Sequence, residues 1–544
     1  MSARSCRRRG HLARAFTLVE MLVAMVLTLI MVAAIAEFYA RVGESVKDGR
    51  ASIEMSASLR TAVQRLKSDL DLVTLPFSPW TDDSGGWGYL EIFEGSNTNA
   101  ASDADVDGDG TIDAAAGSPW LNDANTDGVT DYENQGITSL LGDGDDYIAM
   151  TIRASGEPLT GRHVNPTTTV SEIVKALHAE VIWWVGFDDL DGDGGWDLNE
   201  PRQIYRRQLL IRPDAGQIGV DYPFTQNGWR DVQRYLREWW QVNDVSASIR
   251  REVDNSGNDV LRIRANSLTD LSRRERRFAH LAFRVDTSGN LVDNFPYPQN
   301  LLTAPAANRP LGSLSANSPN VSVAQVNAAD RPSYALQAMA GTAQAEDIVV
   351  SNVLAMDIRV YDQNAPIRAD VPQNNLDTDA VSGLIPGDPG YLYAAATSYP
   401  VIGLGAYVDL GYGDVLFQQL QAAPYNMTPA NARTAVGSGY FAGQSKYLTQ
   451  LGHTYDTWSL SYERDGINQD NDTITVGMMT QQLIDEGTNG LDDDNVNGVD
   501  DVGERETQPP FPKALRGVQV WIRVYEPGTR QMKQATVIGD SIQE

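Results

Sequence analysis

The chain of 544 residues contains a single cysteine, Cys6, and only five histidines. One thiol forms no intramolecular disulfide, so disulfides do not crosslink the loops. The sequence also has no phosphate-binding P-loop, no HExxH zinc motif and no GxSxG nucleophile elbow. The histidines are scattered without metal-ligand spacing, at His11, His163, His178, His280 and His453. We therefore expect a protein that is not an enzyme.

Basic residues are also scarce, with 43 Lys and Arg against 72 Asp and Glu and a net charge of −29. Phosphate backbones repel such a chain unless its cations form a concentrated patch. The arginines 273, 274, 276 and 277 are interleaved with acids, which is more typical of a solvated face than of a nucleic-acid interface. We expect no nucleic-acid partner.

The N-terminus combines basic and apolar segments. Residues 1–15 contain five arginines and no acid, and an apolar run follows from Met21 to Ala36. Arginines before an apolar segment hold that end in the cytoplasm, so the pattern predicts a single-pass membrane helix. A cleaved secretory signal is the alternative, with a weak cleavage site at the alanines 33, 34 and 36.

The junction Arg14-Ala15-Phe16-Thr17-Leu18-Val19-Glu20 resembles the N-terminal signature of type IV pilins and pseudopilins. In that family a basic leader is removed before a phenylalanine, and the fifth mature residue is glutamate. The resemblance implies that prepilin peptidase cleaves between Ala15 and Phe16, that Phe16 is N-methylated and that Glu20 serves in assembly. The family usually has glycine where this chain has Ala15.

An acid at position 20 is costly inside a membrane. An ionised carboxylate in hydrocarbon costs at least ~2.5 kcal/mol and seldom persists without a partner. The family resemblance implies that this partner is the amino group of the neighbouring subunit's first residue, here Phe16. The alternative is an ordinary membrane anchor in which Glu20 lies shallow enough to reach water.

The absence of proline from Phe16 to Leu75 predicts one long helix that ends before Pro76. At 1.5 Å per residue it would be about 80 to 90 Å long, whereas a membrane core is ~30 Å thick. Residues 16–39 would cross the membrane, and the rest would project from it. There an apolar stripe predicts packing against a partner: Leu59, Val63, Leu66 and Leu70.

Several downstream segments alternate apolar and polar residues, which indicates strands. They are Ile148–Ile152, Glu180–Val185, Ile204–Ile211, Leu354–Val360 and Val518–Val524. An antiparallel sheet with one apolar face would cover the projecting helix. We therefore predict an α+β fold in which a long N-terminal helix packs on an antiparallel sheet with large insertions.

The predicted organisation follows from these elements and the Gly-, Asn- and Asp-rich stretches between them. It comprises a leader 1–15, a helix 16–75, an acidic insertion 76–140, a sheet core 141–212, an insertion 213–345, a core strand 346–361, an insertion 362–510 and C-terminal strands 511–544. With Leu59–Leu70 and Pro512–Arg516, this order resembles a minor pseudopilin of the type II secretion system, closest to the J type.

The resemblance implies a pilin-like fold, an inner-membrane anchor and a periplasmic head at the tip of a short filament that supports protein export. It implies the I- and K-type minor and the G-type major pseudopilins as partners, and exported proteins as further ones. Three alternatives stay open: a W-type minor type IV pilus pilin, a membrane-tethered calcium-dependent adhesin, and an exported enzyme that uses the helix as an anchor.

Two acidic loops have the spacing of calcium ligands, with glycine at position 6 and glutamate at position 12. In loop 189–200 the predicted ligands are Asp189, Asp191, Asp193, Gly195, Asp197 and Glu200. In loop 493–504 they are Asp493, Asn495, Asn497, Val499, Asp501 and Glu504. Because the flanks of 189–200 indicate strands, we predict a Ca²⁺ loop at a hairpin tip there, not an EF-hand domain.

Two partial matches lie in the first insertion. One resembles thrombospondin type 3 repeats and has Asp123, Asn125, Asp127, Val129, Asp131 and Asn134 as predicted ligands; the other is dockerin-like, with Asp105, Asp107, Asp109, Thr111 and Asp113. The dockerin-like loop has Ala116 at its twelfth position and lacks the closing ligand. The alternative for every loop is a solvated acidic turn, since Asp, Asn and Gly favour turns without metal.

Overall fold

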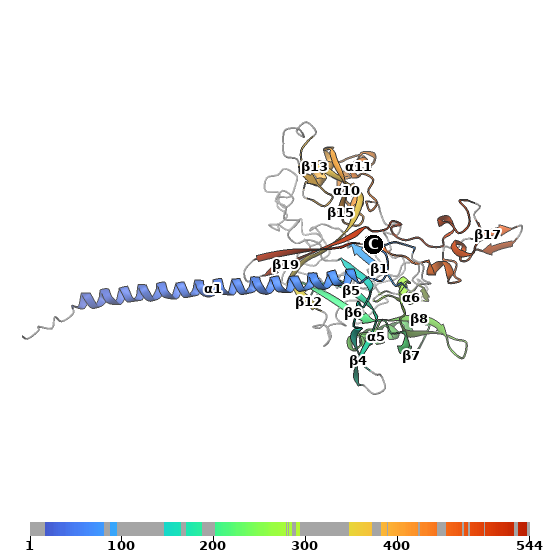
Figure 1. The fold of residues 1–544 in the computed structure, drawn as a ribbon, viewed down its shortest axis with the longest axis horizontal. Helices are drawn as coiled ribbons and strands as arrows, with labels where there is room; N and C mark the ends of the chain where they lie inside the picture. The colour runs from blue at the N-terminus through green and yellow to red at the C-terminus, as the bar shows by residue number, and fades with distance from the viewer. Residues whose placement is uncertain are drawn as a thin grey trace, which may run out of the picture. The chain divides into compact units, whose positions relative to one another are not determined.

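The computed structural model confirms the predicted α+β class (Figure 1). It describes residues 17–80, 87–94, 146–164, 170–187, 202–278, 280, 282–285, 290–293, 348–372, 382–388, 390–422, 425–442, 453–469, 473–476, 479–493, 496–526 and 531–540. These residues divide into two compact units, one with the chain up to Ala57 and the segment 526–531, the other with Ser58–Tyr525 and the chain from Met532 onward.

Helix α1 extends without interruption from Leu18 to Asp71, which the absence of proline permits. Thr17 and Glu20 form a reciprocal capping box at its start: the Glu20 amide donates to Thr17 Oγ1 at 3.2 Å, and the Thr17 amide donates to Glu20 Oε2 at 2.8 Å. The stretch Leu18–Gly43 is long and apolar enough to cross a membrane, and none of its described side chains is buried.

In the second unit, the last turns of α1 carry the buried side chains Leu59, Leu66 and Leu70, with Val63 half-buried. Their four- and three-residue spacing places them on one face of the helix, as predicted. Asp69 on the same part of the helix contacts Trp183 and Arg206. The helix end is therefore fixed on a sheet.

This sheet has six antiparallel strands in the order β12-β6-β5-β2-β1-β16. The strands are β1 Leu90–Glu94, β2 Tyr147–Arg153, β5 His178–Phe187, β6 Arg202–Leu210, β12 Ile348–Ser351 and β16 His453–Asp456. Phe187 pairs with Arg202, which confirms the predicted strands on both sides of loop 189–200. That loop lies outside the described residues.

Strand β2 corrects the expectation of one polar and one apolar sheet face, because all its residues except Arg153 are buried. Trp183, which faces Ile148 in the ladder, contacts Asp69 of the helix. Tyr147 and Trp184 point to the opposite face and belong to a second apolar cluster. Both faces of the sheet centre are therefore covered, and its apolar residues do not alternate with solvent-facing ones.

The second sheet has the order β14-β13-β19-β20, with β15 also paired to β13. The strands are β13 Val353–Ala369, β14 Gly383–Leu384, β15 Val401–Val408, β19 Gly517–Glu526 and β20 Gln531–Asp540. The Ile358 amide donates to Asp146 Oδ2 at 2.8 Å, just before β2, and connects the two sheets. Against β13 and β15 pack three short helices: α9 Tyr391–Ala396, α10 Tyr412–Gln421 and α11 Pro429–Val436.

A separate apolar core lies between helix α5, Gln226–Val242, and the sheet β7-β9-β8. Its strands are β7 Gln217–Pro223, β8 Ala247–Val253 and β9 Asp259–Ala265. The remaining elements are short: β3 Leu159–Val164, β4 Ser171–Ala176, β10 Phe283–Val285, β11 Leu291–Asp293, β17 Thr473–Val476, β18 Met479–Gln482, α6 Leu268–Leu271, and the 3-10 turns η2 Pro213–Ala215, η3 Arg274–Arg276, η9 Leu460–Arg464, η10 Glu486–Thr488 and η11 Val502–Glu504.

Candidate functional site

The predicted assembly residue, Glu20, lies in the first turn of α1. Its Oε2 accepts hydrogen bonds from the Thr17 amide at 2.8 Å and the Thr17 hydroxyl at 2.9 Å. Both residues are exposed. The single chain thus satisfies this carboxylate locally, by the capping chemistry of a helix start. The predicted cleavage site, Ala15 and Phe16, lies outside the described residues.

A buried cluster of charges forms a second constellation, at the edge of the six-stranded sheet. Glu91 of β1 and Asp456 of β16 face each other directly in the antiparallel ladder, and both are completely buried. Like charges in directly opposed positions destabilise a strand pair. The pairing of β16 with β1 therefore requires cations.

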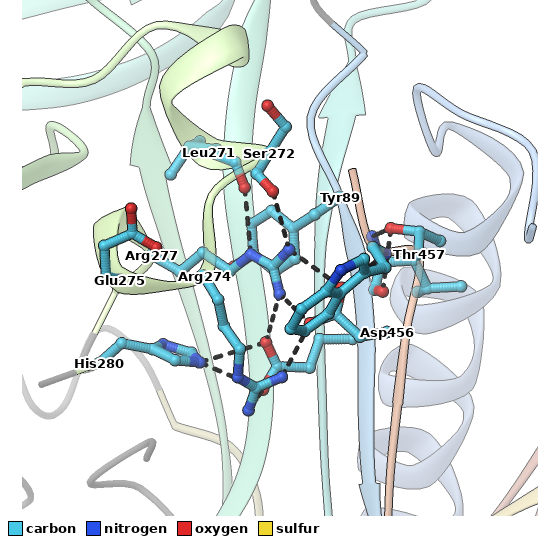
Figure 2. Close-up of polar contacts among 12 residues, drawn as sticks. Tyr89, Leu271, Ser272, Arg274, Glu275, Arg277, His280, Asp456 and Thr457 are labelled. Atoms are coloured by element: carbon cyan, nitrogen blue, oxygen red, sulfur yellow. Dashed lines mark hydrogen bonds and ion pairs between the residues drawn. The ribbon is translucent and has the colours of Figure 1, made fainter. Parts of the chain in front are cut away.

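Two arginines near turn η3 supply these cations (Figure 2). Arg274 Nη2 donates to Glu91 Oε1 at 2.9 Å, and its Nη1 donates to Asp456 Oδ2 at 2.8 Å. Arg277 also reaches both acids, with Nη1 2.8 Å from Glu91 Oε2 and Nη2 3.1 Å from Asp456 Oδ1. Two positive and two negative charges are thus paired in the interior, and segments far apart in the sequence are joined.

The environment shifts the protonation of Glu91. Burial alone would raise the pKa of Glu91, but the charges of Arg274, His280 and Arg277 outweigh burial and hold it well below its usual value. His280 Nε2 lies 3.2 Å from Glu91 Oε1, and the Arg277 guanidinium lies 4.1 Å from the centre of the Tyr89 ring. These groups stabilise the ionised form of the acid, as a structural crosslink requires.

The buried cluster corrects the sequence-based interpretation of the arginines 273–277 as a solvated face. Arg274 is 1% exposed and Arg277 is 3% exposed. The acid interleaved with them, Glu275, accepts a hydrogen bond from Tyr462, and the acids that pair with Arg274 and Arg277 lie about 180 residues away. No local pattern reveals such a pairing; the only signal is the three-residue spacing of two arginines in an otherwise acidic chain.

Loop 493–504 is the one predicted calcium loop that the structure describes, except for positions 494 and 495. Glu504 is buried, and its carboxylate turns into the loop, where it accepts hydrogen bonds from the amides of Asp493 and Asp501. Asp501 Oδ2 is buried and has no hydrogen-bond partner among the residues that the structure describes. Asn497 and Gly498 both have positive φ, 64° and 109°, so the turn needs the residue types that tolerate it.

The described loop brings only part of the predicted ligand set together. Among the described residues, no group of three or more His, Cys, Asp or Glu side chains is placed to hold a metal ion. In this loop, three of the six predicted positions supply amide or backbone oxygens: Asn495, Asn497 and Val499. The predicted calcium loops 105–113, 123–134 and 189–200 lie outside the described residues.

Comparison with known families identifies a motif at the N-terminus. Residues 11–36 match the family model of the prokaryotic N-terminal methylation motif. The chain carries a type IV pilin-like signal. No curated protein and no solved structure matches the sequence.

The pilin-like signal indicates how the N-terminal segment is processed and what kind of partner it has. It implies processing by prepilin peptidase and pilin-like assembly partners, and it suggests a structural role for the protein. The motif covers the predicted cleavage site, Glu20 and most of the apolar stretch, which is consistent with a single-pass membrane anchor, as in pilins. The motif therefore supports a type IV pilin- or pseudopilin-like protein.

Proposed function

We propose that this pilin-like protein is a minor pseudopilin of the J type, which assembles through α1 into a short periplasmic filament of a type II secretion system. Its anchor would lie in the inner membrane with the N-terminus in the cytoplasm. The I- and K-type minor and the G-type major pseudopilins would be its neighbours, and exported proteins would contact the head. The observation that carries this proposal is the methylation motif at the start of a continuous helix of 54 residues.

The contacts of the helix support a role in assembly. None of the described side chains of Leu18–Gly43 is buried, as expected of a segment that packs against lipid or against the helices of other subunits. The buried side chains at the other end, from Leu59 to Leu70, fix the helix to the sheet.

Copurification tests the proposed assignment. The full-length chain, extracted in mild detergent from cells that make the whole secretion system, should retain the I- and K-type pseudopilins. Recovery of type IV pilus subunits in their place would assign the chain to the W-type alternative. Recovery of neither set, from cells in which all are expressed, would contradict assembly into either filament.

We also propose that loops 493–504 and 189–200 bind Ca²⁺ and brace the head. In loop 493–504 two observations support a cation: Asp501 Oδ2 is buried with no hydrogen bond to the described residues, and the Glu504 carboxylate turns into the loop. Calcium takes six to eight oxygen ligands from carboxylates, amides and backbone carbonyls. Loop 189–200 would bind Ca²⁺ at the tip of the hairpin that β5 and β6 form. Outside the cytoplasm, affinities of about 10⁻⁴ to 10⁻³ M are sufficient. Loops 105–113 and 123–134 stay predictions.

A further inference from the structure

The chain contains three Asn-Gly steps, at 227–228, 489–490 and 497–498. At such a step the glycine nitrogen can attack the asparagine side chain, since glycine has no side chain to hinder the approach. The surroundings of the three steps differ. Asn227 and Gly228 lie in the first turn of α5, and the Gly228 amide donates to Thr225 Oγ1 at 3.2 Å, so the helix cap holds the nitrogen.

At the second step, the asparagine side chain is held. Asn489 Oδ1 accepts from the Leu491 amide at 2.7 Å, and its Nδ2 donates to Asp493 Oδ2 at 2.6 Å. Both ends of the amide must be released before the carbon between them can turn toward the Gly490 nitrogen. Each hydrogen bond that has to break first raises the barrier to attack.

The third step differs from the second in its side chain, which is not held, and from the first in that the hydrogen bond of its glycine amide closes a tight turn and not a helix. Asn497 is exposed, and its side-chain amide makes no hydrogen bond to the residues that the structure describes. The Gly498 amide donates to Val496 O at 2.8 Å, and Asn497 between them has φ 64°. This combination defines the rare γ-turn with a left-handed centre, a strained conformation whose ψ is about −65°.

That turn favours the attack. A ψ near −65° places the Gly498 nitrogen closer to the side-chain carbon of Asn497 than an extended backbone does. The side chains of the flanking Val496 and Val499 are 53% and 57% exposed.

We propose that Asn497 is a self-modification site that converts to aspartate and isoaspartate. The Gly498 nitrogen bonds to Asn497 Cγ, the C–Nδ2 bond breaks, and the amide proton leaves with the nitrogen as ammonia. Water then opens the resulting succinimide at either carbonyl and restores a carboxylate. The net change is an amide and a water consumed, and a carboxylate and ammonium formed. No other reactant is needed.

The modification changes the charge of the loop. Asn497 stands at position 5 of the calcium pattern, so the aspartate product exchanges a neutral oxygen ligand for an anionic one. Because affinity in such loops depends on ligand charge, Ca²⁺ would bind more tightly after conversion to aspartate. Isoaspartate lengthens the backbone by one carbon and would weaken the site. This consequence rests on the proposed calcium function, whereas the modification itself does not.

Peptide mapping of the full-length protein tests the proposal. After ageing at mildly alkaline pH in calcium-free buffer, the peptide with Asn497 should show the mass gain of an NH2-to-OH exchange, roughly tenfold or more ahead of the Asn489 peptide, whose two hydrogen bonds must break first. Asn227 should stay unchanged. Asn497→Gln should abolish the gain at that position, and Gly498→Ala should slow it. Equal conversion at 489 and 497, or none at 497, would overturn the proposal.

A metal titration separates the two proposals. Asn497→Asp should bind Ca²⁺ more tightly than the unaged wild type, as measured by calorimetry on the full-length protein. If neither binds Ca²⁺ while the Asn497 peptide still converts, the calcium function is wrong and the modification site stands. If Asn497→Asp binds tightly but wild-type Asn497 never converts, the modification site is wrong and the calcium function stands.

Discussion

Asp69 of α1 and Arg206 of β6 form a two-pronged ion pair in the interior. Arg206 Nε lies 2.7 Å from Asp69 Oδ2 and Nη2 lies 2.9 Å from Oδ1, while Trp183 Nε1 donates to the same carboxylate at 2.8 Å. Both charged side chains are only 5% exposed. Three donors on one buried acid fix the rotation of the helix end against the sheet, which apolar contacts alone would leave less defined.

Removal of this acid should loosen the helix from the sheet. Asp69→Ala leaves Arg206 buried without its anion, which should reduce the free energy of unfolding of the second unit by about 3 to 5 kcal/mol. Asp71→Ala is the matched control, because Asp71 pairs with Lys67 at the surface and should contribute at most about 1 kcal/mol. Urea unfolding of the full-length protein measures both. Equal effects of the two variants would contradict the docking role of Asp69.

The arginine cluster should hold strand β16 in place. Arg277→Gln leaves Glu91 and Asp456 opposed with one cation fewer and should destabilise the protein by about 3 to 5 kcal/mol. The double variant Glu91→Gln with Arg277→Gln restores neutrality and should be less damaging than the sum of the single variants. Arg50→Ala removes a surface pair and is the control. Strict additivity in the cycle would show that the two residues do not interact.

Lowering the pH should remove the stabilisation that ionised Glu91 contributes to the folded state. Its pKa is held well below the usual value in the folded state, so the folded state binds the proton more weakly than the unfolded chain. The stabilisation is therefore complete above the unfolded pKa of about 4.3 and is lost as pH falls toward the lower folded pKa. Glu91→Gln should flatten the acid limb of a stability-against-pH curve. An unchanged acid limb in this variant would contradict the low pKa.

Much of the fold follows from the sequence. The missing proline predicts α1, alternation predicts β13 and β19, and the flanks of loop 189–200 predict the β5–β6 hairpin. The burial of both faces of β2 does not follow, because it depends on segments that pack from elsewhere. The register that opposes Glu91 to Asp456 is likewise set in three dimensions, so their arginine partners carry no local signal.

The candidate sites also differ in how much of each a local sequence pattern predicts. The N-terminal signature is local, and the family match to it lies within residues 11–36. Metal-ligand spacing is local too, and the calcium ligands that it predicts stay a prediction, although the Glu504 carboxylate accepts hydrogen bonds from two amides of its loop. Which oxygens turn toward a cation depends on competing hydrogen bonds, such as those of Glu504 with the amides of Asp493 and Asp501, and spacing does not determine these.

Calcium should stabilise the head through the predicted loops. Ca²⁺ should raise the melting temperature of the full-length protein, and Glu504→Gln should reduce this rise because the loop loses its closing carboxylate. Asp492→Asn, which removes a neighbouring charge outside the ligand pattern, should leave the rise unchanged. The double variant of Asp189 and Glu200 to alanine tests the second loop. Identical calcium responses in all four proteins would refute the proposed sites.

Assembly should depend on the charge at position 20. Glu20→Ala removes the acid that the family pairs with the amino group of the neighbouring subunit, and it should abolish incorporation into filaments while the protein still inserts in the membrane. Glu20→Gln keeps the shape and part of the helix cap, so it separates charge from capping. Normal incorporation of both variants, measured by crosslinking to neighbouring subunits, would rule out this role.

The most direct measurement is the N-terminal residue of the protein extracted from membranes. Pilin-type processing predicts that mass spectrometry finds N-methylphenylalanine at position 16, and that cells without prepilin peptidase yield the uncut leader. An intact Met1 or Ser2 in cells that contain the peptidase would contradict the account and favour an uncleaved membrane tether.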